Sequence, residues 1–221
     1  RYQRGTPLKA SPEERKAIRI AQMPTPKALQ WARDFAAGQP RFLGVAAGQK
    51  GSEIDWTECK GGRLWAFHLH YLDALPLLAG SRNKEDHERA LQLLQDWAQQ
   101  NPPGVDPGWE PYPLSRRSIN LVRTRLLCPD HEALGELCDT LLAQQSAVLL
   151  RSVEFHLRAN HLFTNLKALA LSACLLPELP LLQDATEWLW TRLREEVHEQ
   201  FLPDGGHFER SPMYHSQLTG D

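Results

Sequence analysis

Apolar residues recur at three- and four-residue spacing along most of the chain, a pattern that predicts a series of amphipathic helices. Before residue 61 prolines interrupt the pattern repeatedly, and only Lys27–Ala37 has clear helical periodicity. From Gly61 onward we expect one helix over Leu64–Leu78 and a second around Ala90–Ala98. The second should end at residues 101–104, where Asn-Pro-Pro-Gly cannot continue a helix.

More helical patterns follow a loop rich in proline, glycine and tryptophan at residues 103–113. They cover residues 115–127, 131–157, 161–176 and 181–201. Alternating strand patterns are nearly absent, and no fixed-period repeat of the tetratricopeptide or ankyrin kind occurs. Hairpinned helices that cannot bury their apolar faces alone predict an all-α toroid or helical solenoid.

We expect an irregular segment at residues 1–60 that leads into the helical toroid at 61–221. Helical pattern resumes after Pro212 and stops at Asp221, so the toroid is expected to be truncated at its C-terminal end. Residues that recur at helical spacing define the expected core. They are Leu64, Leu72, Leu94, Trp97, Leu121, Leu149, Leu166, Leu169 and Trp188.

The composition of the 221 residues, 42% hydrophobic and 24% charged, is typical of a globular protein. No apolar run approaches the roughly 20 residues that a membrane helix needs, so no membrane partner is expected. The net charge of -2 gives no global attraction for nucleic acid or any other polyanion. An acidic ligand would need a local basic patch, although each candidate alone is more typical of a solvated helix face. The candidates are Arg116, Arg117, Arg123, Arg125, Arg158 and Arg210.

The four cysteines, Cys59, Cys128, Cys138 and Cys174, have no metal-binding spacing and lie among apolar neighbours. They are predicted to be reduced core residues, and the redox compartment stays open. The chain begins at Arg1 without an initiator methionine or a signal-peptide pattern, as a processed precursor or a trimmed chain would.

Two segments concentrate histidine, asparagine, tyrosine and arginine at junctions between apolar helices. They are residues 154–165 (EFHLRANHLFTN) and residues 204–215 (DGGHFERSPMYH). Rigid helices that present polar side chains from their connecting loops commonly build binding sites.

Each of these residues also has a structural interpretation. Asn160 suits the N-cap of a helix that begins at His161, and His161 could be a hydrogen-bonded structural histidine. Tyr214 could be a packed aromatic residue with a wet hydroxyl. The Asp-Gly-Gly run at residues 204–206 signals a turn in any case.

Together with two earlier stretches, these segments resemble the heparinase II/III and alginate-lyase-like family of polysaccharide lyases. The earlier stretches are residues 64–73 (LWAFHLHYLD) and residues 109–120 (WEPYPLSRRSIN). The likeness covers about residues 40–221. It implies an incomplete (α/α) toroid and, in family members, a C-terminal β-sandwich domain that is absent from this chain. It also implies a periplasmic or secreted protein that needs no cofactor or metal.

The resemblance further implies β-elimination beside the carboxylate of a uronic acid in a heparan-type, alginate-type or exopolysaccharide substrate. Asn160 and His161 would neutralise that carboxylate and so stabilise the enolate-like transition state. Tyr214 would serve as general acid, or as acid and base. Further residues would support Tyr214 or contact sugar. These are Trp109, Tyr112, Arg117, Asn120, His207, Glu209, Arg210 and His215.

The sequence predicts that Asn160, His161 and Tyr214 meet in one cleft. A glycoside hydrolase on a similar toroid is an alternative, with Glu154, Asp204 and Glu209 as available carboxylates. A non-catalytic glycan-binding domain is another. A zinc enzyme is disfavoured. His68 and His70 are two residues apart, so their side chains diverge on a helix, and a predicted helix break separates His156 from His161.

Overall fold

The computed structural model describes residues 23–47, 53–157 and 160–208. A short helix, α2 (Pro26–Ala36), and a two-stranded antiparallel hairpin, β1 (Arg41–Phe42) and β2 (Val45–Ala46), come first. Seven further helices follow in the described part of the chain. They are α3 (Arg63–Tyr71), α4 (Ala74–Ala79), α5 (Lys84–Gln100), α6 (Pro111–Leu127), α7 (Glu132–Ser152), α8 (Asn160–Leu175) and α9 (Pro180–Gln200).

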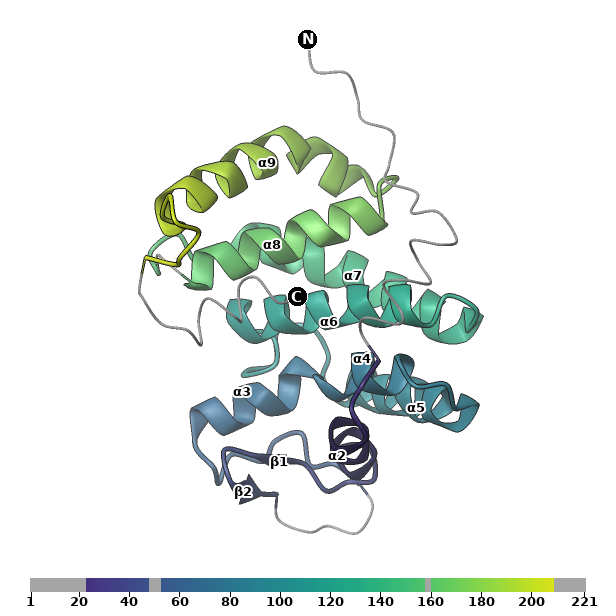
Figure 1. Ribbon diagram of the computed structural model, residues 1–221. Coiled ribbons are helices and arrows are strands. Elements are labelled where there is room, and N and C mark those ends of the chain that lie inside the picture. The colour runs from purple at the N-terminus through teal and green to yellow at the C-terminus, as the bar shows by residue number, and fades with distance from the viewer. Residues whose placement is uncertain (1–22, 48–52, 158–159, 209–221) are drawn as a thin grey trace.

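The helices are stacked in chain order, from α2 and α5 at the bottom of Figure 1 through α6 and α7 to α9 at the top. Each layer packs on the next: α4 on α5 and α6, α6 on α7 and α8, and α8 on α9. This arrangement confirms the predicted all-α, incomplete toroid. Among the described residues no helix is long and apolar enough to cross a membrane.

Helix α6 lies at the centre and packs against α3, α4, α7 and α8. Pro111 occupies its first turn, where a missing backbone N–H costs nothing. Many of its polar residues are buried because neighbouring helices surround it, and several pair with other side chains or with the backbone. Ser118 donates to Gln145 at 2.9 Å, and Thr124 donates to the carbonyl of Asn120 at 2.7 Å.

The prediction of a single helix over Leu64–Leu78 was wrong. The helix ends at Leu72, which adopts a left-handed conformation with φ 56°. Side chains of α6 donate hydrogen bonds to the carbonyls that have no helical partner after the break. Arg117 Nη1 donates to the His70 carbonyl at 3.1 Å, and Asn120 Nδ2 donates to the Tyr71 carbonyl at 3.0 Å. Asn120 also donates to Asp73, so α6 fixes the end of α3. Tertiary hydrogen bonds therefore override the apolar periodicity.

Seven of the nine predicted core residues are buried, and Leu64 and Trp188 are not. Leu64 is 55% exposed because α3 turns Trp65 and Leu69 toward the core instead. Trp188 is 38% exposed, while its neighbour Leu189 is fully buried and Trp188 packs edge-on against Phe155. In each helix a residue next to the predicted one, Trp65 or Leu189, is buried instead.

All four cysteines are free thiols. Cys128 and Cys138 are buried as predicted, and burial raises the pKa of the Cys138 thiol to about 12. The core prediction was wrong for Cys59 and Cys174, which are exposed. Cys59 lies in the loop before α3, and Cys174 lies on the outward side of the last turn of α8.

A buried carboxylate ties α2 to α5. Asp86, whose side chain is fully buried, accepts hydrogen bonds from Arg33 at 2.8 and 2.9 Å. It also accepts from the Ser81 hydroxyl at 2.6 Å and from Arg89 at 2.9 Å. The Arg33 guanidinium, aided by Ser81 and Arg89, lowers the pKa of Asp86 to about 2.

This carboxylate should make the protein sensitive to acid. The folded-state pKa of Asp86 lies below its ordinary value of 3.8, so its stabilisation is present above pH 3.8 and is lost as pH falls through 2. We expect the free energy of unfolding to lose about 2 kcal/mol from this group over that interval. Urea titrations of the wild type and Asp86→Asn at several pH values measure it. Parallel loss of stability in both proteins would contradict the expectation.

Candidate functional site

Five polar residues from three segments meet between α6 and α8. We call them the α6–α8 polar cluster: Tyr112, Ser115, Glu154, His161 and Asn165. The first two lie in the first turns of α6, Glu154 lies just after α7, and the last two lie in the first turns of α8. Because α6 and α8 are the most extensively packed pair of helices, the cluster rests on the rigid centre of the fold.

His161 is held on two sides. Its Nδ1 lies 3.2 Å from Glu154 Oε2, and its ring lies over the Tyr112 ring at 4.3 Å between centroids and 31° between planes. The His161 side chain is 31% exposed. One face and one edge of the ring are therefore fixed, while part of the ring is open to a ligand.

Aromatic residues extend the cluster toward α3. Tyr112 contacts Tyr71 edge-on at 6.1 Å, and Tyr71 in turn contacts His68 at 4.8 Å. Burial raises the pKa of the Tyr71 hydroxyl and lowers the pKa of His68, so it favours the neutral form of both side chains. The permanent cation nearby is Arg116, 6.0 Å from the centre of the Tyr71 ring and 3.9 Å from Asp73.

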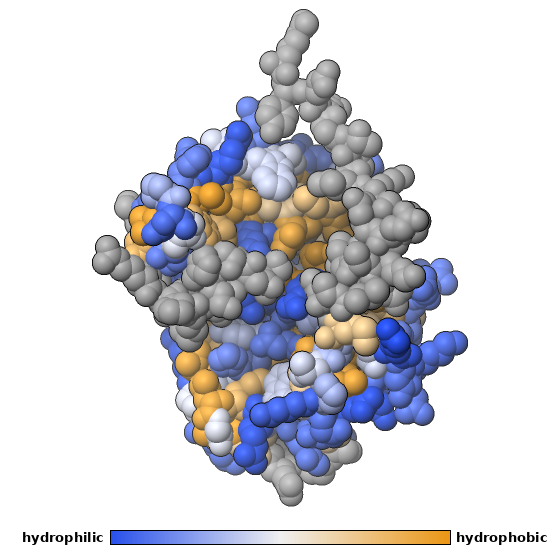
Figure 2. Space-filling model, viewed as in Figure 1, coloured by the Kyte–Doolittle hydropathy of each residue, from blue (hydrophilic) through white to orange (hydrophobic). Residues whose placement is uncertain are grey.

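The surface agrees with a polar site in this region. In the view of Figure 2 a band of hydrophilic residues crosses the middle of the molecule at the height of α6, with hydrophobic residues above and below it. Polar groups that gather on the inner helices of a toroid provide hydrogen-bond partners for a polar ligand.

Three residues predicted to contact sugar lie in the core instead. Trp109 is 5% exposed, and Arg117 and Asn120 are fully buried. The Arg117 guanidinium lies 4.0 Å from the centre of the Trp97 ring, and its Nη1 donates to the Gly108 carbonyl at 2.7 Å. Their role in contacting sugar stays a prediction, and in the described structure they pack inside the protein. They support the loop and helix end that frame the cluster.

Among the other predicted residues, Asn160 is the first residue of α8, whereas an N-cap would precede the helix. His207 is 2% exposed and its Nε2 lies 3.2 Å from Gln200 Oε1. The predicted turn at residues 204–206 is present, with φ 84° at Gly205. Four predicted residues and the basic candidate Arg158 lie outside the described residues, as does the predicted meeting with Tyr214. The four are Glu209, Arg210, Tyr214 and His215.

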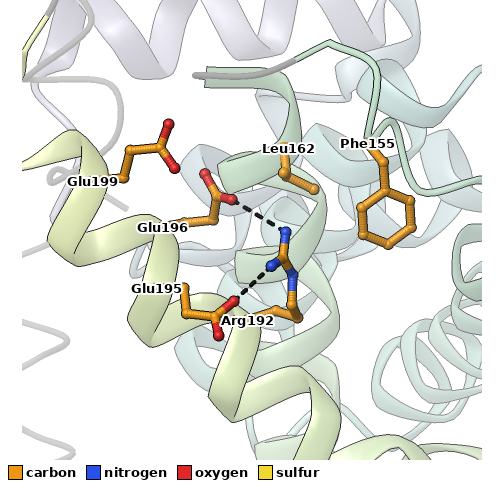
Figure 3. A pocket seen from close by; sticks show the side chains of 6 residues that line it. All are labelled: Phe155, Leu162, Arg192, Glu195, Glu196 and Glu199. Atoms are coloured by element: carbon orange, nitrogen blue, oxygen red, sulfur yellow. Dashed lines mark hydrogen bonds and ion pairs between the residues drawn. The ribbon is translucent and has the colours of Figure 1, made fainter.

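A pocket of about 400 Å³ lies on the α9 side of the cluster, lined by Phe155, Leu162, Arg192, Glu195, Glu196 and Glu199. Figure 3 shows Arg192 paired with Glu195 at 2.6 Å and Glu196 at 3.6 Å, with Glu199 beyond them. Three carboxylates face a single cation that is already paired. The pocket is therefore electrostatically unsuited to a polyanionic glycan.

Sequence reasoning did not assign Ser115, Asn165 or Tyr71 to the site, and it considered Glu154 only as a hydrolase carboxylate. A usable signal existed, since Asn165 follows His161 by one helical turn and therefore shares its face. Within the described residues, no three histidine, cysteine, aspartate or glutamate side chains are grouped as metal ligands would be.

The described fold is an incomplete all-α toroid with a polar cluster on its central helices. The chain belongs to the Heparinase II/III N-terminus family, whose sequence profile matches residues 26–221. No curated protein matches the sequence.

Solved structures share the fold. The chain is similar to a crystal structure of heparinase III, with a TM-score of 0.73 and 19% identity over 99% of this chain. It is also similar to heparan sulfate lyase HepC from Pedobacter heparinus, with a TM-score of 0.71 and 19% identity over 93% of this chain. The matched regions are 36% and 37% of those two proteins, so the chain spans little more than a third of their length.

Proposed function

We propose that the protein is a polysaccharide lyase that cleaves a uronic-acid-containing glycan by β-elimination. The observation that carries the proposal is the position of Asn160 and His161 at the start of α8, with His161 held by Tyr112 and Glu154. Family membership supports the lyase class.

The chemistry explains why these residue types are suitable. The C5 proton of a uronate is a weak acid, because the carbanion it leaves lies beside a negative carboxylate. Hydrogen bonds from the Asn160 amide and the His161 ring would neutralise that carboxylate and stabilise the enolate-like intermediate. A base then removes the C5 proton, and an acid protonates the departing O4 oxygen. We assign the acid, or both roles, to Tyr214.

The described geometry also bears on the hydrolase alternative. A glycosidase needs two carboxyl groups that face one glycosidic bond. Glu154 is 8% exposed, and its carboxylate already contacts His161 and Asn165. It is thus placed to hold other residues rather than to protonate a sugar oxygen. Because a polymeric substrate is met outside the cytoplasm, the proposal includes a periplasmic or secreted location.

Replacing Asn160 with alanine should weaken both turnover and binding, because the uronate carboxylate is charged in the ground state as well as in the transition state. Loss of one charge-assisted donor should lower kcat/KM by about 10- to 1000-fold. The measurement is ultraviolet absorbance of unsaturated uronate products from heparan sulfate, alginate and an acidic exopolysaccharide. Polymer binding with no product from the full-length wild type would favour the glycan-binding alternative instead.

A further inference from the structure

Glu154 is held in place by other members of the α6–α8 polar cluster. Its backbone N–H donates to Asn165 Oδ1 at 2.9 Å, and its Oε2 accepts from Asn165 Nδ2 at 3.3 Å. Asn165 Nδ2 is also 3.0 Å from Ser115 Oγ, and both Asn165 and Ser115 are fully buried. The carboxylate therefore has a fixed place between α6 and α8.

This network determines which atom donates the hydrogen bond between Glu154 and His161. Asn165 must present its amide nitrogen to Glu154 Oε2, because its oxygen is occupied by the Glu154 backbone N–H. A carboxylate can only accept hydrogen bonds, so the proton in the 3.2 Å contact lies on His161 Nδ1. The Tyr112 ring, whose centroid lies 4.3 Å from that of His161, opposes rotation of the imidazole.

With Nδ1 facing Glu154, the other ring nitrogen, Nε2, lies on the opposite side of the imidazole. In the imidazolium form of the ring both nitrogens carry a proton, so the second proton lies on Nε2. Nε2 is then a donor on the side of the ring opposite Glu154. An anionic sugar carboxylate is the ligand that such a donor suits.

We propose that Glu154 is a positioning residue, which holds His161 through Nδ1 so that Nε2 is presented to the uronate carboxylate of the substrate. This inference rests on the proposed lyase function and adds to it the residue that orients the neutralising histidine. Partners that fix the tautomer of a functional histidine commonly change activity by about 10- to 100-fold when they are replaced.

The test uses Glu154→Gln in the full-length protein. Glutamine keeps the length of the side chain, but its neutral oxygen is a weaker acceptor for the His161 Nδ1–H than the ionised carboxylate. We expect kcat/KM on the cleaved polymer to fall about 10- to 100-fold. In nitrogen-15 spectra of labelled histidine, the His161 proton should lie on Nδ1 in the wild type and be shared between Nδ1 and Nε2 in the variant. A His161→Gln variant assigns the signals.

The matched control is Glu88→Gln, since Glu88 contacts His131 Nε2 at 3.1 Å in another Glu–His pair, on the exposed surface between α5 and α7. It should leave kcat/KM and the His161 signals unchanged. A Glu154→Gln protein with wild-type kcat/KM overturns the proposal, and so does lowered activity with unchanged His161 signals. If Glu154→Gln does not fold, a wild-type His161 without a proton on Nδ1 is sufficient to overturn it.

Failure of the proposed function would look different. A full-length wild type that forms no unsaturated product from any uronate polymer removes the lyase proposal. The histidine spectra of wild type and Glu154→Gln still show, in that case, whether Glu154 holds the His161 ring.

Discussion

Replacing Tyr214 with phenylalanine should lower lyase turnover by a factor of about 10² to 10⁴, the usual cost of losing a general acid or base. The change removes only a hydroxyl group and keeps the ring, so folding and packing should alter little. Tyr214 lies outside the described residues, and its role rests on the motif at residues 204–215. Initial rates of unsaturated-product formation measure the effect.

Polymer binding is the internal control for this variant. If Tyr214 acts only in the chemical step, the affinity of Tyr214→Phe for the polymer should stay close to that of the wild type, unlike that of Asn160→Ala. A Tyr214→Phe enzyme with full activity would make Tyr214 a packing residue, which is the structural interpretation of its place in the sequence.

Replacing Trp97 with alanine should destabilise the protein by about 3–5 kcal/mol, the range for a buried aromatic residue cut to alanine. Trp97 is fully buried, its ring lies 4.0 Å from the Arg117 guanidinium, and its Nε1 donates to His70 Nδ1 at 3.1 Å. The variant therefore leaves a cavity and also removes contacts from two buried polar groups. Denaturant unfolding followed by circular dichroism measures the loss.

The matched control is Trp190→Ala on α9, since Trp190 is 39% exposed. Exposed positions away from special contacts usually change stability by no more than about 0.5 kcal/mol. A similar loss in both tryptophan variants would mean that burial does not determine the difference, and that Arg117 and His70 are held by other contacts.

The fold class was predictable because the spacing of apolar residues indicates a helix even when one residue is assigned to the wrong side of it. Leu64 was assigned to the core wrongly, yet α3 is still a helix, and Trp65 and Leu69 provide its buried side. The break at Leu72 was not predictable from the same pattern. It depends on hydrogen bonds from α6, which lies about 50 residues away in sequence, and no local propensity reports a partner at that distance.

The candidate site shows the same division. The junction around Asn160 and His161 was recognisable, because polar side chains concentrated between two apolar helices are unusual. Arg117 was equally conspicuous in its motif, but only the packed structure shows that it contacts Trp97 and backbone carbonyls rather than solvent. Likewise, the bond from Glu154 to His161 depends on a chain reversal that spacing alone does not specify.

The contacts at the end of α3 have a consequence for how the molecule opens. Isolated helix ends fray readily, and their amide protons exchange with solvent from the end inward. Here the His70 and Tyr71 carbonyls are bound by side chains of the central helix α6. The last turn of α3 can therefore loosen only when its packing on α6 is lost. The ring pair of Tyr71 and Tyr112 should thus resist local unfolding as strongly as the hydrophobic core does.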